Sequence, residues 1–153
     1  MTSILPSAID RGVESLLDTA AVQRAFAFFE SHADAITEQQ IQINPIPAPP
    51  FGERGRAEYL RQKFSTLGLC EARVDDEGNC VALRRGESEM PLLVISAHLD
   101  TVFPADTDVL PRRIGAKLFS PGIATTPAVW QPLSLSQTHC SHAKLKRLVR
   151  FCL

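Results

Sequence analysis

The sequence has 153 residues, of which 44% are hydrophobic and 22% are charged. That length allows one domain with a real core, and the composition is ordinary for a soluble globular protein. The formal net charge of −1 gives no support to a nucleic-acid partner. No apolar run reaches the roughly 18 residues that a membrane span needs, and the first residues do not form a secretory signal. We therefore expect a cytoplasmic protein without a membrane or nucleic-acid partner, whose four cysteines serve as small apolar side chains.

The charge is divided unevenly along the chain. All 17 acidic residues and 9 of the 16 basic residues lie in 1–108, whereas 109–153 hold 7 basic residues and no acidic one. The last part, "SPGIATTPAVWQPLSLSQTHCSHAKLKRLVRFCL", is also rich in Pro, Ser, Thr and His and has no sustained helical or strand period. A solvated basic tail is one interpretation of this break.

Two helices are predicted in the first half of the chain, whereas 1–17 carry no clear pattern. Asp18 or Thr19 can cap a helix over 20–44, and four prolines in 45–53 end it. A second helix is predicted from about Glu53 to Leu67, with Gly68 at the glycine position that follows many helices. Apolar residues at three-to-four spacing form one stripe on each helix: Val22, Phe26, Phe29, Ala33 and Ile36 on the first, and Ala57, Leu60, Phe64 and Leu67 on the second.

Strand patterns follow the second helix. "LCEARVD" (69–75) and "CVALRR" (80–85) read as a hairpin joined by turn residues at 76–79. The continuous apolar run "PLLVISA" (91–97) suits a central strand covered on both faces, and a short hairpin can form around Gly115. This order of elements predicts an α/β fold with a mixed sheet flanked by helices.

The apolar run at 91–97 leads directly to His98 and Asp100. Ligands of open α/β sheets bind beyond the carboxyl ends of strands, and residues two apart lie on the same side of an extended chain. A neutral imidazole is the commonest metal ligand, and its second ring nitrogen needs a partner that orients it. From spacing alone, a histidine that caps a strand and bonds locally is the more common case.

The surrounding sequence makes the pattern more specific. "LLVISAHLDTV" resembles the first metal-ligand signature of the co-catalytic zinc metallopeptidases of family M-twenty, which includes aminoacylase, tripeptide aminopeptidase, acetylornithine deacetylase and succinyl-diaminopimelate desuccinylase. "IPAPPFGERGRAEYLRQKFSTLGL", "VDDEGNCVALRRG", "TVFPADTDV" and "LFSPGI" resemble the segments around that signature. The resemblance covers roughly Val22 to Ile123 and is nearest to the tripeptide-peptidase-like branch.

The resemblance implies an incomplete, N-terminal part of a zinc-exopeptidase-like catalytic domain over 1–123. His98 would bind one of two zinc ions, Asp100 would be its catalytic partner, and the substrate would be a small peptide or an N-acyl amino acid. Glu53 is a further carboxylate in the matched region, but the start of a surface helix explains it better, because acidic side chains favour the positive end of the helix dipole.

The later residues of such a site are missing from this sequence. In that family a bridging aspartate comes from Gly-Asp-Asn, a glutamate pair supplies the general base and a ligand, and a further carboxylate and a late histidine complete the set. Here Ala124, Thr125 and Thr126 stand where Gly-Asp-Asn is expected, and no acidic residue follows Asp108. We therefore expect the chain alone to bind zinc weakly or not at all and to be inactive.

The codons GGC GAC AAC, read one base later, begin GCG ACA AC and encode Ala-Thr-Thr. A one-base deletion near codons 123–124 would therefore make 124–153 a non-homologous tail read out of frame, disordered or weakly structured. The tail has two other interpretations: soft metal ligands at His139, Cys140, His142 and Cys152, or a basic surface helix with Leu145, Leu148, Val149 and Cys152 on one side. The frame change is the more economical account.

Three functions thus stay open at this point. The first is a truncated zinc-dependent peptidase or amidase, and the second is a non-catalytic interaction or structural module that retains the front half of the fold. A serine hydrolase using Ser96 and His98 has little support, because no GxSxG turn is present.

Overall fold

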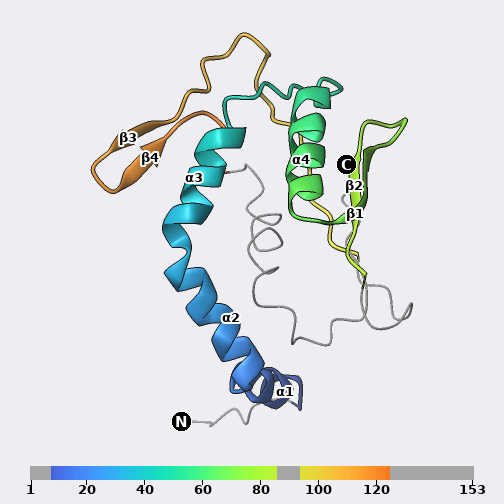
Figure 1. The fold of residues 1–153 in the computed structure, drawn as a ribbon. Helices are drawn as coiled ribbons and strands as arrows, with labels where there is room; N and C mark the ends of the chain where they lie inside the picture. Colours follow the sequence, from blue (N-terminus) through green and yellow to red (C-terminus); the bar gives the residue numbers. More distant parts are fainter. Residues whose placement is uncertain (1–7, 86–93, 125–153) are drawn as a thin grey trace. The chain divides into compact units, whose positions relative to one another are not determined.

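The computed structural model describes residues 8–85 and 94–124, which form eight helices and strands (Figure 1). The chain divides into two compact units, Met1–Ala35 and Ile36–Leu153. The apolar residues 91–93 and all of the predicted tail 124–153 except Ala124 lie outside the described residues.

The first unit contains α1 (Ala8–Leu17), α2 (Ala20–Ser31) and the beginning of α3 (Ala33–Ile43). Helix α1 had no counterpart in the sequence prediction. Thr19 caps α2, as predicted: its backbone is extended, and its hydroxyl accepts a hydrogen bond from the Val22 N–H at 3.4 Å.

The single helix predicted over 20–44 was wrong, because the chain forms two helices that separate at His32. The Ser31 hydroxyl donates to the Phe28 carbonyl at 3.0 Å, and His32 Nδ1 lies 2.8 Å from the same oxygen. Such local side-chain bonds offer the backbone an alternative to the helix ladder. The His32 ring also stacks on Phe28 with centroids 4.1 Å apart.

The apolar stripe predicted for this region is not buried in α2. No residue of α2 is buried, and Phe26 and Phe29 are 49% and 37% exposed. The periodicity is therefore present, but among the described residues the stripe does not face a core.

The second unit is built around α4 (Arg54–Thr66), which packs against the hairpin of β1 (Cys70–Val74) and β2 (Cys80–Leu83) (Figure 1). The helix was predicted within one or two residues at each end, and Gly68 follows it with φ +71°. The predicted inner face is confirmed at Ala57, Leu60 and Phe64, which are at most 1% exposed. Eight buried residues form the core: Ile43, Ala57, Leu60, Phe64, Leu69, Cys80, Ala82 and Leu99.

The predicted hairpin over 69–85 is confirmed, with antiparallel pairs such as Val74 with Cys80. Its turn is held by Asp75, whose carboxylate accepts the N–H groups of Glu77 and Asn79 at 3.1 and 2.9 Å. Gly78 takes φ +90°, a conformation that glycine adopts without a steric penalty.

A second antiparallel hairpin, β3 (Arg112–Ile114) and β4 (Lys117–Phe119), turns at Gly115, also as predicted. The two hairpins make the chain a mixture of helices and small antiparallel sheets, which confirms the α/β composition only in this coarse sense.

The predicted mixed sheet is not formed by the described residues. All strand pairs there are antiparallel, and 94–100 are extended without belonging to any sheet. A strand requires a neighbouring strand to pair its backbone groups, and the described part of the chain provides none beside this segment. The described part of the segment is covered on one side, where Ile95 and Ala97 pack against the core and Leu99 is part of it. The predicted cover on both faces was wrong there, because Val94 is 50% exposed and Ser96 is also exposed.

Candidate functional site

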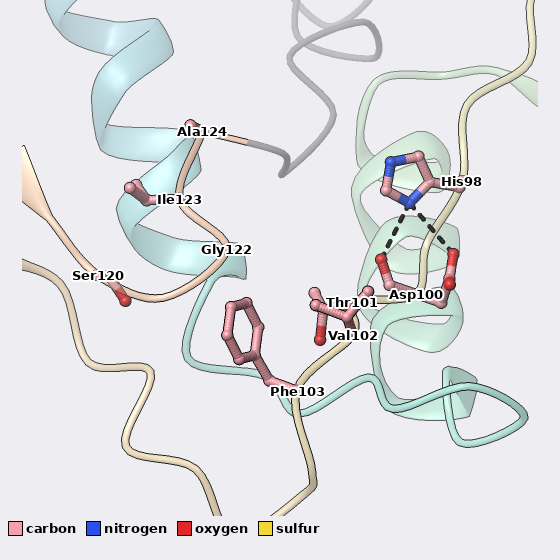
Figure 2. A pocket seen from close by; sticks show the side chains of 9 residues that line it. All are labelled: His98, Asp100, Thr101, Val102, Phe103, Ser120, Gly122, Ile123 and Ala124. Carbon is pink, nitrogen blue, oxygen red and sulfur yellow. Dashed lines mark hydrogen bonds and ion pairs between the residues drawn. The ribbon is translucent and has the colours of Figure 1, made fainter.

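His98 and Asp100 lie side by side on the outward face of the extended segment, as period-two geometry predicts. His98 Nδ1 is 3.1 Å from Asp100 Oδ1 and 2.9 Å from the Asp100 backbone oxygen (Figure 2). Both contacts need a proton on Nδ1, because both oxygens are acceptors. In the neutral ring this leaves the lone pair on Nε2, and no hydrogen bond of Nε2 occurs among the described residues.

The imidazole faces a hollow of about 290 Å³ in the second unit. One wall is the segment His98–Phe103, and the other is the turn from Ser120 to Ala124 (Figure 2). Its lining is largely apolar apart from the His98–Asp100 pair and two hydroxyl side chains: His98, Asp100, Thr101, Val102, Phe103, Ser120, Gly122, Ile123 and Ala124.

The two walls lie close together at Gly122. This residue takes φ +76°, and a methyl group in place of its hydrogen would lie 3.4 Å from Cε2 of Phe103 and 3.6 Å from Cγ2 of Thr101. A side chain here would be strained by the positive φ, although a methyl group would meet the opposite wall only in ordinary van der Waals contact. The glycine of the "SPGI" turn thus allows the left-handed backbone conformation of the second wall.

The wall that carries His98 is attached to the rest of the second unit by buried polar contacts. Thr101 is 7% exposed, and its backbone N–H donates to the Ala48 carbonyl at 2.7 Å. Arg56 from α4 is 2% exposed, and its Nη1 donates to the Leu99 carbonyl at 3.0 Å. Leu99 lies between His98 and Asp100, so the hydrogen bond from Arg56 fixes the backbone of the motif itself.

The opposite wall is held by Asn44, which follows the last residue of α3 and is fully buried. Its Nδ2 donates to the Val109 carbonyl at 2.6 Å and to the Ser120 hydroxyl at 2.7 Å, and it lies 3.4 Å from the Pro121 carbonyl. The Ser120 hydroxyl in turn donates to Val109 at 2.7 Å. Asn44 therefore joins the two segments that flank the β3–β4 hairpin.

The buried guanidinium of Arg56 interacts electrostatically with the carboxylate of Asp100. Burial lowers the pKa of its guanidinium, and the nearby Asp100 carboxylate opposes that shift by favouring the charged form. Two further donors of Arg56 reach the carbonyls of Ile46 at 2.9 Å and Asn44 at 3.2 Å. The guanidinium of Arg56 thus donates to three backbone carbonyls, one of which belongs to Leu99 within the motif.

Sequence reasoning did not single out Arg56 and Asn44. One signal was available for Arg56, because it precedes Leu60 and Phe64 at intervals of four and so falls on the inner stripe of α4. A charged residue on a buried stripe needs partners, which is a reason to look for a buried network. Asn44 offered no comparable signal, because it ends a polar-rich helix just before a proline.

The remaining candidate site residues from the sequence are Glu53, Ser96 and the four soft ligands of the tail. Glu53 sits at the N-cap position of α4, where its carboxylate accepts the Phe51 N–H at 2.7 Å. Ser96 is exposed, and the Nδ1 of His98 is turned toward Asp100. The four soft ligands considered at His139, Cys140, His142 and Cys152 lie outside the described residues.

Within 8–85 and 94–124, no three His, Cys, Asp or Glu side chains come together in a group that could hold a metal ion. In the same part of the chain, no helix is both long and apolar enough to cross a membrane.

Comparison with known proteins gives a partial likeness to a hydrolase. No protein-family model matches the chain. A Pyrococcus furiosus protein named as a LysW-lysine/LysW-ornithine hydrolase is 36% identical over 70 residues, which cover 43% of this chain and 21% of that protein. The chain thus spans about a fifth of the length of this relative. The likeness supports a hydrolase relationship at a coarse level.

Proposed function

We propose that this chain carries the first part of a metal-dependent hydrolase domain, in which His98 is a zinc ligand through Nε2 and Asp100 orients its ring. The contact that carries the proposal is the hydrogen bond from Nδ1 to the Asp100 carboxylate at 3.1 Å. A carboxylate on one ring nitrogen fixes the tautomer and makes the other nitrogen a better metal ligand. The partial likeness to a named hydrolase supports the same class.

The residues present fit one ligand position of such a site. His98 is exposed at a hollow that a small molecule or ion can enter, and Asp100 beside it is half-buried. When bound in an intact site of this kind, zinc activates a water molecule for attack on a peptide or N-acyl amide carbonyl. His98 would hold the ion, Asp100 would hold the proton on Nδ1, and the apolar wall residues would exclude water from the hollow.

We propose further that the 153-residue chain does not complete this reaction by itself. A catalytic zinc needs about three protein ligands, and His98 is a single one. The sequence has no acidic residue after Asp108 to supply a further carboxylate or a general base. Zinc binding is therefore expected to be weak, and the substrate class of peptides and N-acyl amides refers to an intact relative.

Zinc titration followed by NMR of the histidine rings tests the ligand assignment. The His98 ring signals are expected to shift with added zinc, and His98→Ala is expected to abolish the shifts seen at neighbouring Thr101 and Gly122. His32→Ala is the matched control, because this histidine also has an engaged Nδ1 but lies between α2 and α3 with its ring stacked on Phe28. Zinc shifts that persist without His98 would contradict the assignment.

An activity assay tests the proposal about turnover. The purified chain is expected to hydrolyse no dipeptide, tripeptide or N-acyl amino acid in the presence of zinc, cobalt or manganese. Metal-dependent hydrolysis that is lost in His98→Ala would overturn this part of the proposal and would still support His98 as a ligand.

The proposed frame change can be tested separately at the edge of the hollow. By the sequence resemblance, Ala124, Thr125 and Thr126 stand where the family has Gly-Asp-Asn with its bridging aspartate, and Ala124 lines the hollow that contains His98. The combined change A124G, T125D and T126N is expected to tighten zinc binding by about tenfold or more, because it adds a carboxylate ligand. Reading the gene downstream of codon 123 in the restored frame should reveal a glutamate pair and a late histidine, and their absence would refute the frame change.

The alternative function is a non-catalytic module that retains the front of the fold. The observation that favours it is the ordered core around α4, β1 and β2 in the second unit. A cooperative thermal transition of a soluble monomer, together with no effect of zinc on His98, would support this alternative. Aggregation or a non-cooperative transition would oppose it.

A further inference from the structure

Two buried polar side chains lie beneath the hollow and hold its two walls. Arg56 is 2% exposed and bonds the Leu99 carbonyl on one wall, and Asn44 is 0% exposed and bonds Ser120 on the other. They are joined to each other, since Arg56 Nη2 donates to the Asn44 carbonyl at 3.2 Å. A continuous set of hydrogen bonds therefore runs from the His98 wall to the Gly122 wall.

We propose that Asn44 and Arg56 act as a positioning pair that sets the separation of the two walls of the His98 hollow. Neither side chain lines the hollow, so the pair acts through Leu99 and Ser120. Its importance for metal binding rests on the function proposed above, whereas its effect on the walls does not.

The choice of an arginine is difficult to explain by packing alone. Removing a guanidinium from water has a large cost, and buried charged groups can often be replaced by apolar residues without loss of stability. An apolar side chain at position 56 would fill the same space beside Leu60. What only arginine provides is a planar group with several donors, which here fixes the carbonyls of Ile46, Leu99 and Asn44 at 2.9, 3.0 and 3.2 Å.

Asn44 makes the corresponding contacts on the other side. The two hydrogens of its side-chain amide are directed to Val109 and Ser120 at 2.6 and 2.7 Å, and the Pro121 carbonyl lies within 3.4 Å. These residues are 65 to 77 positions away in sequence. The turn that carries Gly122 is thus held by the side chain of the residue that follows α3. The backbone carbonyl of the same residue accepts a hydrogen bond from Arg56.

The proximity of Phe103 and Gly122 gives a direct measure of wall separation. Nuclear Overhauser effects between the Phe103 ring and the Gly122 α-protons are expected in the wild-type chain, because a β-carbon placed on Gly122 would lie only 3.4 Å from Cε2 of the Phe103 ring. In Asn44→Ala we expect these signals to be lost while the protein stays folded. Asn79→Ala is the matched control: it removes an asparagine side chain that bonds Asp75 at 3.1 Å in the β1–β2 turn, and it should leave the Phe103–Gly122 signals unchanged.

A second variant addresses the arginine. Arg56→Lys keeps the positive charge but cannot hold three carbonyls in a plane. We expect the ¹⁵N signature of a proton on His98 Nδ1 to weaken, because the backbone between His98 and Asp100 is no longer fixed at Leu99. An unchanged signature in folded Arg56→Lys would remove Arg56 from the pair.

The decisive outcome concerns the wall contact. If Asn44→Ala and Asn79→Ala both lower the melting temperature and both keep the Phe103–Gly122 signals, the role of Asn44 is only structural and the proposal is overturned. If Asn44→Ala does not fold, Ser120→Ala decides by the same signals, because it removes one acceptor of Asn44 and leaves the core intact. All these measurements are made without metal, so a failure of zinc to bind His98 would contradict the proposed function and leave this inference standing.

Discussion

Two cysteines show how strongly the local environment changes the chemistry of a residue. Cys80 on β2 is 1% exposed and belongs to the core, whereas Cys70 at the start of β1 is half-buried; neither is in a disulfide. Burial raises the pKa of the Cys80 thiol to about 12, and the nearby Arg61 opposes this only in part. Cys80 therefore behaves as a small apolar side chain, in keeping with the role expected from the sequence.

The raised pKa of Cys80 predicts a loss of stability at alkaline pH. Unfolding returns the thiol to its ordinary pKa of 9.0, so between pH 9.0 and about 12 the unfolded chain releases a proton that the folded chain keeps. The contribution to stability is fully present below pH 9.0 and is lost as the pH rises through about 12. Urea unfolding of Cys80→Ala should show a shallower decline over this range than the wild type. Cys70→Ala is the control, and an equal decline in all three chains would contradict the assignment.

Asp100 is expected to matter through the ring of His98. In D100N the carboxylate acceptor of the 3.1 Å bond is replaced by a neutral amide of the same shape, while the backbone oxygen at 2.9 Å remains. Loss of a group that orients a metal-binding histidine typically weakens binding by about 10- to 100-fold. Zinc titration of D100N should show a decrease in this range, and D106N provides a control in an exposed loop. Equal affinities would exclude an orienting role for Asp100.

Helix α4 is the element on which the second unit depends. Phe64 is fully buried between the helix and the β1–β2 hairpin, so Phe64→Ala is expected to lower the free energy of unfolding by about 3–5 kcal/mol. Phe51→Ala is the matched control, because that ring is 103% exposed and its removal should change stability by no more than about 0.5 kcal/mol. Urea unfolding measures both. Similar losses for the two variants would show that the described core is not what stabilises the chain.

The elements that could be predicted from the sequence are those whose signals are local. The inner face of α4 and the turn at Gly78 follow from spacing and turn chemistry within a few residues. The contact of His98 with Asp100 is also local, because the two residues are only two positions apart. The break at His32 was missed, because side-chain bonds to Phe28 override a periodic pattern that continues through them.

The support of the site could not be predicted in the same way. Arg56 reaches Leu99 across 43 positions, and Asn44 reaches Ser120 across 76. Such contacts depend on how helices, hairpins and extended segments pack, and no periodicity encodes them. The central strand predicted from the apolar run before His98 failed for a related reason. Burial of both faces and strand pairing each require neighbouring elements that the pattern does not identify, and Val94 in this run is 50% exposed.

At the scale of the molecule, the residues that the structure describes are buried to different degrees in the two units. In the first unit, α2 has no buried residue, and Val13, Leu16 and Leu17 of α1 are 50%, 62% and 42% exposed. In the second unit, a continuous core joins α4 to both strands of the first hairpin. Regions with few buried apolar contacts open locally at a lower cost in free energy than the core does.

This inequality predicts different hydrogen-exchange behaviour for two helices of similar length. Amides of α2 should exchange through local opening and show little protection, whereas amides of α4 should exchange only through opening close to global unfolding. The Phe64→Ala variant separates the two processes, because it should reduce protection in α4 and leave α2 unchanged. The measurement is amide exchange followed by NMR or mass spectrometry on the full chain. Equal protection of α2 and α4 in the wild type, with a parallel loss in Phe64→Ala, would mean that the two units unfold as one cooperative body.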